Sequence, residues 1–444
     1  MPNNVLKPHK FVDARDPASK PTIFQGAVEG HVLVKNVNNA LPLKKPKFLS
    51  LFGYDGAAPL QNTQYETNQS FTRWMLGFQS ASQVSDQQLH DIIGTFKTAP
   101  NSESPGVALG GTLITGGGSG ATTPSYISAP YDAFTAQANE DNTWLAWDFV
   151  SENPSVNQAS EACIVMINEF SAEGIDRPGL ADPYSDRIVE NVASQCNNTM
   201  VVIHNVHIRL VDSWFEHPNI TAVILAHLPG QDSGKALVEV MYGKQSPSGR
   251  MPYTVAKEAS DYGFLLHPVR ADAVSNYYTQ SNFTEGVYID YKAFIAQNKT
   301  PRFEFGFGLT YTTFNYSNLQ SEVLTNVNTA YNAPNATIQE GGLASLWNVV
   351  ATVDCDVTNT GSVPAAEVAQ LYVGIPGAPP KQLRGYNKQL IQPAQTAHAH
   401  FDLKRRDLST WDVQTQQWVL QRGTYPLYVG KSVLDIQLTG TLQL

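Results

Sequence analysis

The sequence is poor in charged side chains, poor in cysteine and without any long hydrophobic run. Only 15% of its 444 residues are charged, and acids outnumber bases, which gives a net charge of −10. Binding to a phosphate backbone needs clustered Lys and Arg, so the composition argues against a nucleic-acid partner. The longest apolar runs cover about five to seven residues, far fewer than the roughly 20 that cross a bilayer, so we expect no membrane span.

The compartment is only weakly indicated. Three cysteines, Cys163, Cys196 and Cys355, allow at most one disulfide and leave one thiol, with the pairing open. The N-terminal residues lack the apolar segment of a signal peptide. N-glycosylation sequons are a mild indication of secretion, and they begin at Asn68, Asn197, Asn219, Asn282, Asn298, Asn315 and Asn335.

The chain is too long for one core, so we expect two or three domains. Residues 1–28 are polar and Pro-rich and are typical of a tail or a linker. Residues 29–255 are expected to form an α/β sandwich domain, 256–345 an extended linker and 346–444 a β-sandwich.

The α/β prediction rests on apolar runs that alternate with helical periods. Such an order indicates right-handed crossovers and a mostly parallel sheet with helices on both faces. We expect strands at 47–53, 162–167, 200–204 and 220–226, and helices at 130–138, 185–195, 208–215 and 233–242. In the last third, short alternating runs separated by turn signals favour antiparallel strands, at 347–358, 366–374, 397–403, 418–420, 424–429 and 435–444.

The loop after the 162–167 strand carries the main candidate for chemistry. Glu169, Glu173, Asp176 and Arg177 lie within nine residues of one another. Ligands of open α/β sheets bind beyond the carboxyl ends of the strands, which is where this loop is expected. A glutamate there suits general acid or base catalysis. The spacing alone favours a solvated, salt-bridged loop over a catalytic one.

Three other motifs favour structural roles. The glycine-rich residues 109–120 lack the lysine and the strand-to-helix context of a P-loop, and we expect a flexible surface loop. Residues 227–235 are expected to form a turn between strand and helix, with Asp232 or Ser233 as helix cap. His204 and His207 have no Cys or acid nearby at metal-ligand spacing, so we predict no metal site.

The chain resembles fungal β-glucosidases of glycoside hydrolase family 3 from about residue 30 to its last residue. The motifs that carry this resemblance occur in the family's order. They are Val32–Lys44, Cys196–His204, His227–Gly234, Ser246–Tyr253, Thr284–Tyr291, Pro301–Phe314, Glu367–Val373, Pro380–Gly385 and Arg405–Asp412.

The resemblance implies an α/β sandwich followed by a fibronectin type III-like domain. It also implies a secreted enzyme of cellulose or glucan degradation, needing no cofactor, that releases glucose from β-glucosides with retention of configuration. In the family a Glu-Gly pair followed by Asp-Arg holds the acid/base residue. Ser171-Ala-Glu-Gly174 and Asp176-Arg177 match this motif, so the role falls on Glu173, with Glu169 the weaker candidate.

The family's nucleophile has no counterpart here. It is an aspartate in a Ser-Asp-Trp motif of an N-terminal barrel, and this sequence contains no Ser-Asp-Trp. In Asp212-Ser-Trp214 the aspartate and the serine are exchanged. We therefore expect that the barrel is missing and that the chain alone is inactive on β-glucosides or cello-oligosaccharides. Two alternatives stay open, a non-catalytic module that binds glucan or a partner, and one chain of a split enzyme. The oligomeric state is unknown.

Overall fold

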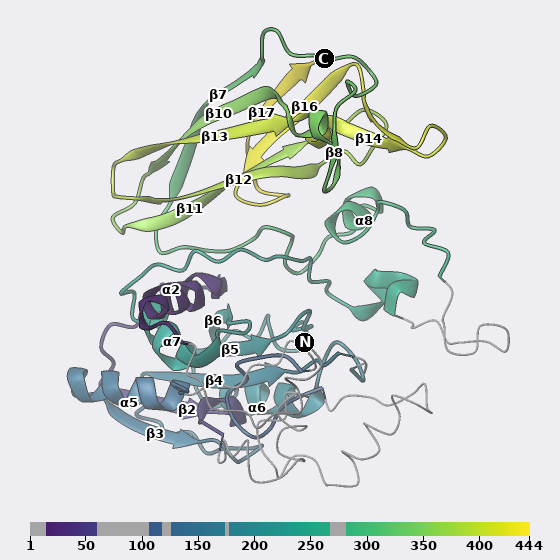
Figure 1. The fold of residues 1–444 in the computed structure, drawn as a ribbon. Coiled ribbons are helices and arrows are strands. Elements are labelled where there is room, and N and C mark those ends of the chain that lie inside the picture. The colour runs from purple at the N-terminus through teal and green to yellow at the C-terminus, as the bar shows by residue number, and fades with distance from the viewer. Residues whose placement is uncertain (1–14, 60–105, 118–125, 174–176, 267–280) are drawn as a thin grey trace, which may run out of the picture.

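The computed structural model describes residues 15–59, 106–117, 126–173, 177–266 and 281–444. Figure 1 shows an α/β domain below a β-sandwich, with the segment that carries α8 (Tyr291–Ala296) between them. The fold class expected from the sequence is confirmed. In the described part of the chain, no helix is both long and apolar enough to cross a bilayer.

A six-stranded sheet forms the centre of the α/β domain, in the order β1-β6-β5-β4-β2-β3. Five strands run parallel, and β1 pairs antiparallel with β6 at one edge. The strands are β1 (Val32–Asn36), β2 (Phe48–Phe52), β3 (Trp144–Asp148), β4 (Ala162–Glu169), β5 (Thr199–Asn205) and β6 (Ile220–Leu225). This topology brings the carboxyl ends of β2, β4, β5 and β6 to one edge of the domain.

Strand β4 shows why these runs are continuously apolar. All eight of its residues are buried, because helices cover both faces of the sheet. Cys163, Val165 and Ile167 pack in the core that includes α6 (Pro183–Ala193). The alternate residues Ala162, Ile164 and Met166 pack in the core on the other face. That face is covered by α2 (Lys20–Gly30), α5 (Pro130–Asp141) and α7 (Ser233–Met241).

Two expected elements of the α/β domain differ from the structure, and β1 and β3 were not among the strands that we expected. Part of the expected tail is the helix α2, which packs Ala27 and Val28 into the core shared with α7. The expected helix at 208–215 forms isolated turns instead. Arg209 Nη2 and Trp214 Nε1 both donate to Asp186 Oδ1, at 2.7 and 2.8 Å, and these bonds hold the segment against α6.

Two antiparallel sheets enclose the core of the β-sandwich, in the orders β13-β10-β7 and β12-β11-β16-β17. Expected strands are present as β10 (Val349–Asn359), β11 (Ala365–Val373), β13 (Thr396–Lys404), β15 (Gln417–Leu420), β16 (Thr424–Gly430) and β17 (Ile436–Gln443). Five further strands were not expected from the sequence: β7 (Phe314–Val323), β12 (Gln382–Ile391), β14 (Ser409–Asp412) and the short pair β8 (Ile338–Gln339) and β9 (Gly342–Leu343). Because β7 pairs with β10, the segment 256–345 is not only a linker but supplies a strand of the sandwich.

Candidate active site

The candidate loop leaves the carboxyl end of β4, at the centre of the sheet. Glu169 is the last residue of this strand and is buried. Glu173, four residues further along, is exposed. Arg177 is partly buried, and Asp176 lies outside the described residues. The structure thus gives the two glutamates different environments within one loop.

Glu169 is held by the protein rather than offered to solvent. Its Oε1 forms an ion pair with Arg177 Nη1, and its Oε2 accepts from the His207 amide at 3.4 Å. Burial raises the pKa of Glu169 to about 7, although the charge of Arg177 acts in the opposite direction. Arg177 Nη1 also donates to the Ile208 carbonyl at 2.9 Å, so its guanidinium is fixed on two sides.

The glycine-rich segment fixes the backbone around Glu173. Gly117 N–H donates to the Ser171 carbonyl at 3.0 Å, and Glu173 N–H donates to the Gly117 carbonyl at 3.4 Å. The described part of the glycine-rich residues, 109–117, is not the surface loop that we expected, because 111–115 are buried. Residues 118–120 lie outside the described part of the chain. Thr112, Leu113 and Ile114 are buried, since they pack against the end of the sheet.

A buried polar network lies beneath this segment. Asp55 follows β2, Asn168 lies near the end of β4 and His204 near the end of β5. Asp55 Oδ2 pairs with His204 Nδ1, and Asn168 Nδ2 donates to Asp55 Oδ1 at 2.7 Å. Ser233, at the start of α7, places its hydroxyl 3.0 Å from His204 Nε2. Burial raises the pKa of Asp55, and the contact with His204 opposes that shift.

This network corrects one expectation and includes residues that no sequence motif pointed to. Residues 227–235 do form a turn between β6 and α7, but neither Asp232 nor Ser233 caps the helix with its side chain. Ser233 instead bonds to His204, which we had considered only as a metal ligand. Among the described residues, no group of three or more His, Cys, Asp or Glu side chains could hold a metal ion. Asp55, Asn168 and Ser233 could have been found by asking which polar residues lie at the carboxyl ends of parallel strands or begin the helix that follows.

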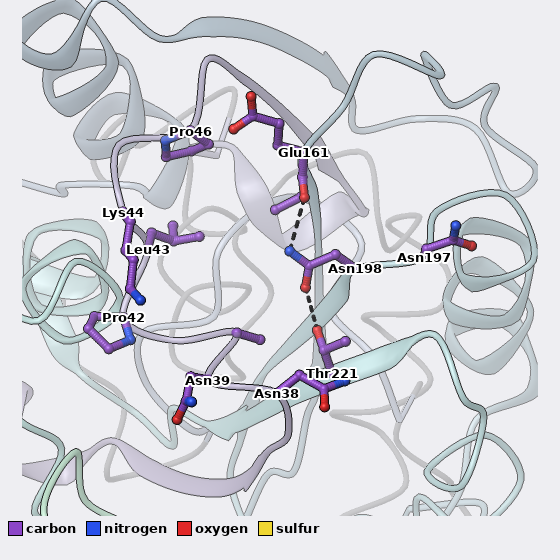
Figure 2. Close-up of a pocket in the computed structure, with 12 residues that line it drawn as sticks. Asn38, Asn39, Pro42, Leu43, Lys44, Pro46, Glu161, Asn197, Asn198 and Thr221 are labelled. Carbon is purple, nitrogen blue, oxygen red and sulfur yellow. Dashed lines mark hydrogen bonds between the residues drawn. The ribbon is translucent and has the colours of Figure 1, made fainter.

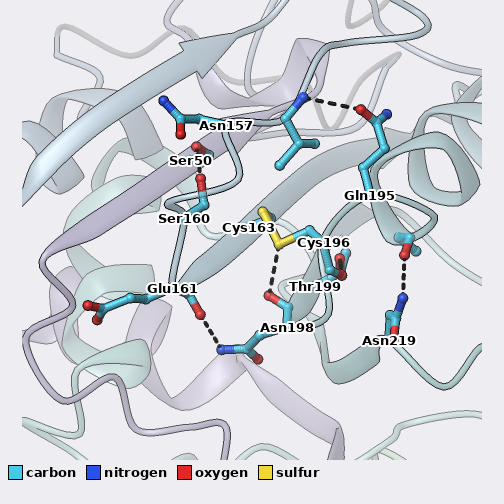
Figure 3. Close-up of a disulfide and its surroundings, with 12 residues drawn as sticks. Ser50, Asn157, Ser160, Glu161, Cys163, Gln195, Cys196, Asn198, Thr199 and Asn219 are labelled. Atoms are coloured by element: carbon cyan, nitrogen blue, oxygen red, sulfur yellow. Dashed lines mark hydrogen bonds between the residues drawn. A yellow bond between two sulfur atoms is a disulfide. The ribbon is translucent and has the colours of Figure 1, made fainter.

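A disulfide joins Cys163, in β4, to Cys196, after α6 (Figure 3). The pairing that the sequence left open is thereby settled, and Cys355 is the buried free thiol. The two cysteines are 33 positions apart, and the loop that they close contains both candidate glutamates. The bond ties the beginning of β4 to the connection before β5.

A polar cavity of about 360 Å³ lies at the opposite ends of the strands (Figure 2). Asn198 forms part of its wall, with Nδ2 donating to the Glu161 carbonyl at 3.0 Å and Oδ1 accepting from Thr221 Oγ1 at 2.6 Å. Asn198 and Glu161 precede β5 and β4 directly, whereas Glu169 and Glu173 follow the other end of β4. The cavity is therefore not part of the candidate active site.

Comparison with known proteins identifies the family. The model of the glycosyl hydrolase family 3 C-terminal domain matches residues 31–311, and that of a fibronectin type III-like domain matches 367–433. The chain belongs to glycosyl hydrolase family 3. The resemblance found in the sequence is thus confirmed, and the buried network and the Glu173 loop both lie in the family's C-terminal domain.

Fungal relatives match along the whole chain. The chain is 50% identical to "Probable beta-glucosidase M" of Aspergillus niger over 440 residues, covering 99% of this chain and 53% of the relative. A crystal structure of Beta-D-glucoside glucohydrolase from Trichoderma reesei is 34% identical with a TM-score of 0.78, covering 96% of this chain and 56% of that one. A family 3 β-glucosidase structure from Neurospora crassa gives a TM-score of 0.80 at 28% identity, covering 98% and 58%. The chain spans about half the length of the curated relatives it matches.

Proposed function

We propose that this chain supplies the general acid/base of a retaining β-glucosidase, with Glu173 in that role. The proposal includes terminal β-D-glucosyl residues of glucans and cello-oligosaccharides as substrates, and a secreted protein. The supporting observation is that Glu173 is exposed beyond the carboxyl end of β4, whereas Glu169 is buried against Arg177. A proton donor has to reach the glycosidic oxygen, and only an accessible carboxyl can do so.

In the proposed reaction Glu173 protonates the leaving oxygen while a second carboxylate attacks the anomeric carbon. The glycosyl intermediate is then hydrolysed by a water molecule that Glu173 deprotonates, so the residue returns to its acid form. We place the attacking carboxylate on the part of the relatives that these 444 residues do not cover. Glu169 does not suit the nucleophile's role, because it is paired and enclosed, and Asp176 lies outside the described residues.

A fusion protein tests this role. The chain is joined to the N-terminal part of the Aspergillus niger relative and assayed on an aryl β-glucoside with a poor leaving group. We expect hydrolysis by the fusion, background rates from the chain alone, and a loss of about 10²–10⁴-fold on Glu173→Gln, the range for general acid–base catalysis. An activated dinitrophenyl glucoside needs no protonation, so its glycosylation step is spared in the variant.

Glu161→Gln is the matched control, since Glu161 precedes the other end of β4. Full activity of the Glu173→Gln fusion on both substrates would refute the assignment. Saturable binding of cello-oligosaccharides by the isolated chain, unchanged in Glu173→Ala, would support the alternative of a glucan-binding module. Activity on mixing the two separate chains would favour a split enzyme.

A further inference from the structure

The polar network at the carboxyl edge of the sheet is continuous and completely enclosed. It runs from Asn168 through Asp55 and His204 to Ser233, and each link is a direct contact between two side chains in the core of the domain. All four side chains have no accessible surface. Burying this many polar groups is unfavourable unless each finds a partner, so the network has to be satisfied as a unit.

The contacts of His204 with Ser233 on one side and Asp55 on the other resemble those of a Ser-His-Asp catalytic triad. The burial of all three side chains excludes that chemistry. A nucleophilic serine has to reach a substrate, and the Ser233 hydroxyl lies instead 3.2 Å from Thr112 Oγ1. Both of its neighbours, His204 and Thr112, are themselves buried. The three side chains therefore have a structural role and not a catalytic one.

What the network holds is the segment 106–117. Asp55 Oδ1 accepts from the Leu113 amide at 2.8 Å. Asn168 bonds to both backbone groups of Ala108, donating to its carbonyl and accepting from its amide, each at 2.8 Å. Together with the Thr112 hydroxyl, these bonds connect the segment to the ends of β2 and β4 and to the start of α7.

The far end of the same segment reaches the Glu173 loop. Gly117 forms a parallel bridge with Ala172 and exchanges backbone bonds with Ser171 and Glu173. A small apolar cluster of Ala108, Leu113 and Phe170, with Ala172 packed against it, fills the space between the network and the loop. Only three residues separate the anchored Leu113 from Gly117, so we expect movement at one end to be transmitted to the other.

We propose that Asp55, Asn168, His204 and Ser233 are positioning residues that fix the Glu173 loop through the segment 106–117. The mechanical part of the proposal stands on the contacts alone. Its catalytic meaning rests on the proposed function of Glu173.

Hydrogen–deuterium exchange of the full chain tests the mechanical part. Ser233→Ala removes the hydroxyl that links His204 to Thr112. We expect exchange of the backbone amides in 108–117 and 170–173 to accelerate at least tenfold, while β6 keeps its wild-type rates. Should Ser233→Ala fail to fold, Thr112→Val removes the same link to the segment with little change of shape and carries the test.

Ser50→Ala is the matched control. Ser50, in β2, is equally buried, and its hydroxyl lies 2.7 Å from that of Ser160. Ser160 precedes β4, whereas the candidate loop follows the other end of that strand. The control should leave exchange in 108–117 and 170–173 unchanged. Wild-type exchange in the Ser233→Ala variant, or the same acceleration in Ser50→Ala, would overturn the proposal.

The fusion protein separates this inference from the proposed function. If both hold, Ser233→Ala in the fusion lowers kcat on the poor leaving group with little change of KM, and the activated substrate recovers most of the loss in its glycosylation step. Accelerated exchange combined with full activity of Glu173→Gln would leave the positioning intact and refute the catalytic role. Unchanged exchange in Ser233→Ala, combined with an inactive Glu173→Gln fusion, would refute the positioning role and support the catalytic role of Glu173.

Discussion

Glu169 and Arg177 form an ion pair that is nearly closed to solvent, with 4% and 11% of their side chains exposed. The burial of Glu169 outweighs the attraction of Arg177 and raises the carboxyl pKa from 4.5 to about 7. The folded protein therefore binds the proton of Glu169 more tightly than the unfolded chain does. Stability from this group is present at low pH and declines as the pH rises from about 4.5 to about 7.

Glu169→Gln should remove this pH dependence, because glutamine resembles the protonated acid. We expect the difference in free energy of unfolding, variant minus wild type, to increase by on the order of 2 kcal/mol from pH 5 to pH 8. Urea unfolding at both pH values measures this difference. Glu161→Gln should show no such trend, and a wild type that becomes relatively more stable at pH 8 would contradict the prediction.

An exposed ladder of histidines and aspartates on the β-sandwich predicts a second pH effect. His398 and His400 on β13 contact Asp354 and Asp356 on β10, and Asp402 follows on β13. β7 adds Asn318, which donates to Asp356 at 2.7 Å, and Glu322, which lies opposite Thr352 in β10. The hydrogen bonds to these aspartates raise the pKa of both histidines.

Stability from this ladder is fully present below the ordinary histidine value of 6.5 and is lost as the pH rises through the raised pKa values. Since the histidines are exposed, each pair contributes only a few tenths of a kcal/mol. His398→Gln with His400→Gln should lower the Tm by about 1–3 °C at pH 5 and leave it unchanged at pH 8. An equal loss at both pH values would point to packing instead of charge.

The ion pair of Arg250 and Glu367 links the two domains and should be costly to break. Its N–O distance is 2.7 Å, and Glu367 also accepts from Tyr316 at 2.7 Å while almost entirely buried. Glu367→Gln leaves the buried Arg250 charge without its counter-ion, so we expect a loss of about 3 kcal/mol in denaturant unfolding. The more exposed pair of Lys388 and Glu29 also joins the domains, and Lys388→Gln should cost less than about 1 kcal/mol. Equal losses would contradict this ranking.

Two helical glycines should respond oppositely to alanine. A Cβ on Gly234 in α7 would lie 2.0 Å from the Ala129 carbonyl oxygen, whereas one on Gly26 in α2 would meet nothing within 4 Å. We expect Gly234→Ala to destabilise the protein by about 1–3 kcal/mol and Gly26→Ala to stabilise it by about 0.5–1 kcal/mol. Thermal unfolding of both variants checks the signs, and a stabilised Gly234→Ala would contradict the packing at Ala129.

The parallel sheet could be predicted because strands that are buried on both faces consist almost entirely of apolar residues. β4, β5 and β6 are continuous apolar runs, and α6 and α7 have a clear helical period. The elements that were not predicted lack such an apolar run or a clear period. α2 buries only Ala27 and Val28, so its helix depends on packing against α7. β12 lies at a sheet edge and buries only Ile391 fully, which leaves no regular alternation.

The candidate site was predictable only in part. Its place beyond the carboxyl end of β4 follows from the topology of the sheet. The difference between Glu169 and Glu173 does not, because both lie at the carboxyl end of the same strand and only tertiary contacts bury one of them. The hydrogen bond between Ser233 and His204 joins residues 29 positions apart on separate elements, so no local sequence pattern predicts it.

The disulfide makes the candidate loop part of a covalent ring that runs from Cys163 to Cys196. A protease that cuts once inside this ring releases nothing, because the two products stay joined through the sulfur atoms. The nicked chain then migrates at full length on a gel without reductant and separates only when the disulfide is reduced. Cuts elsewhere in the chain yield fragments under both conditions. Comparing the two gels thus reports nicking around Glu173 selectively, against the background of all other cleavage.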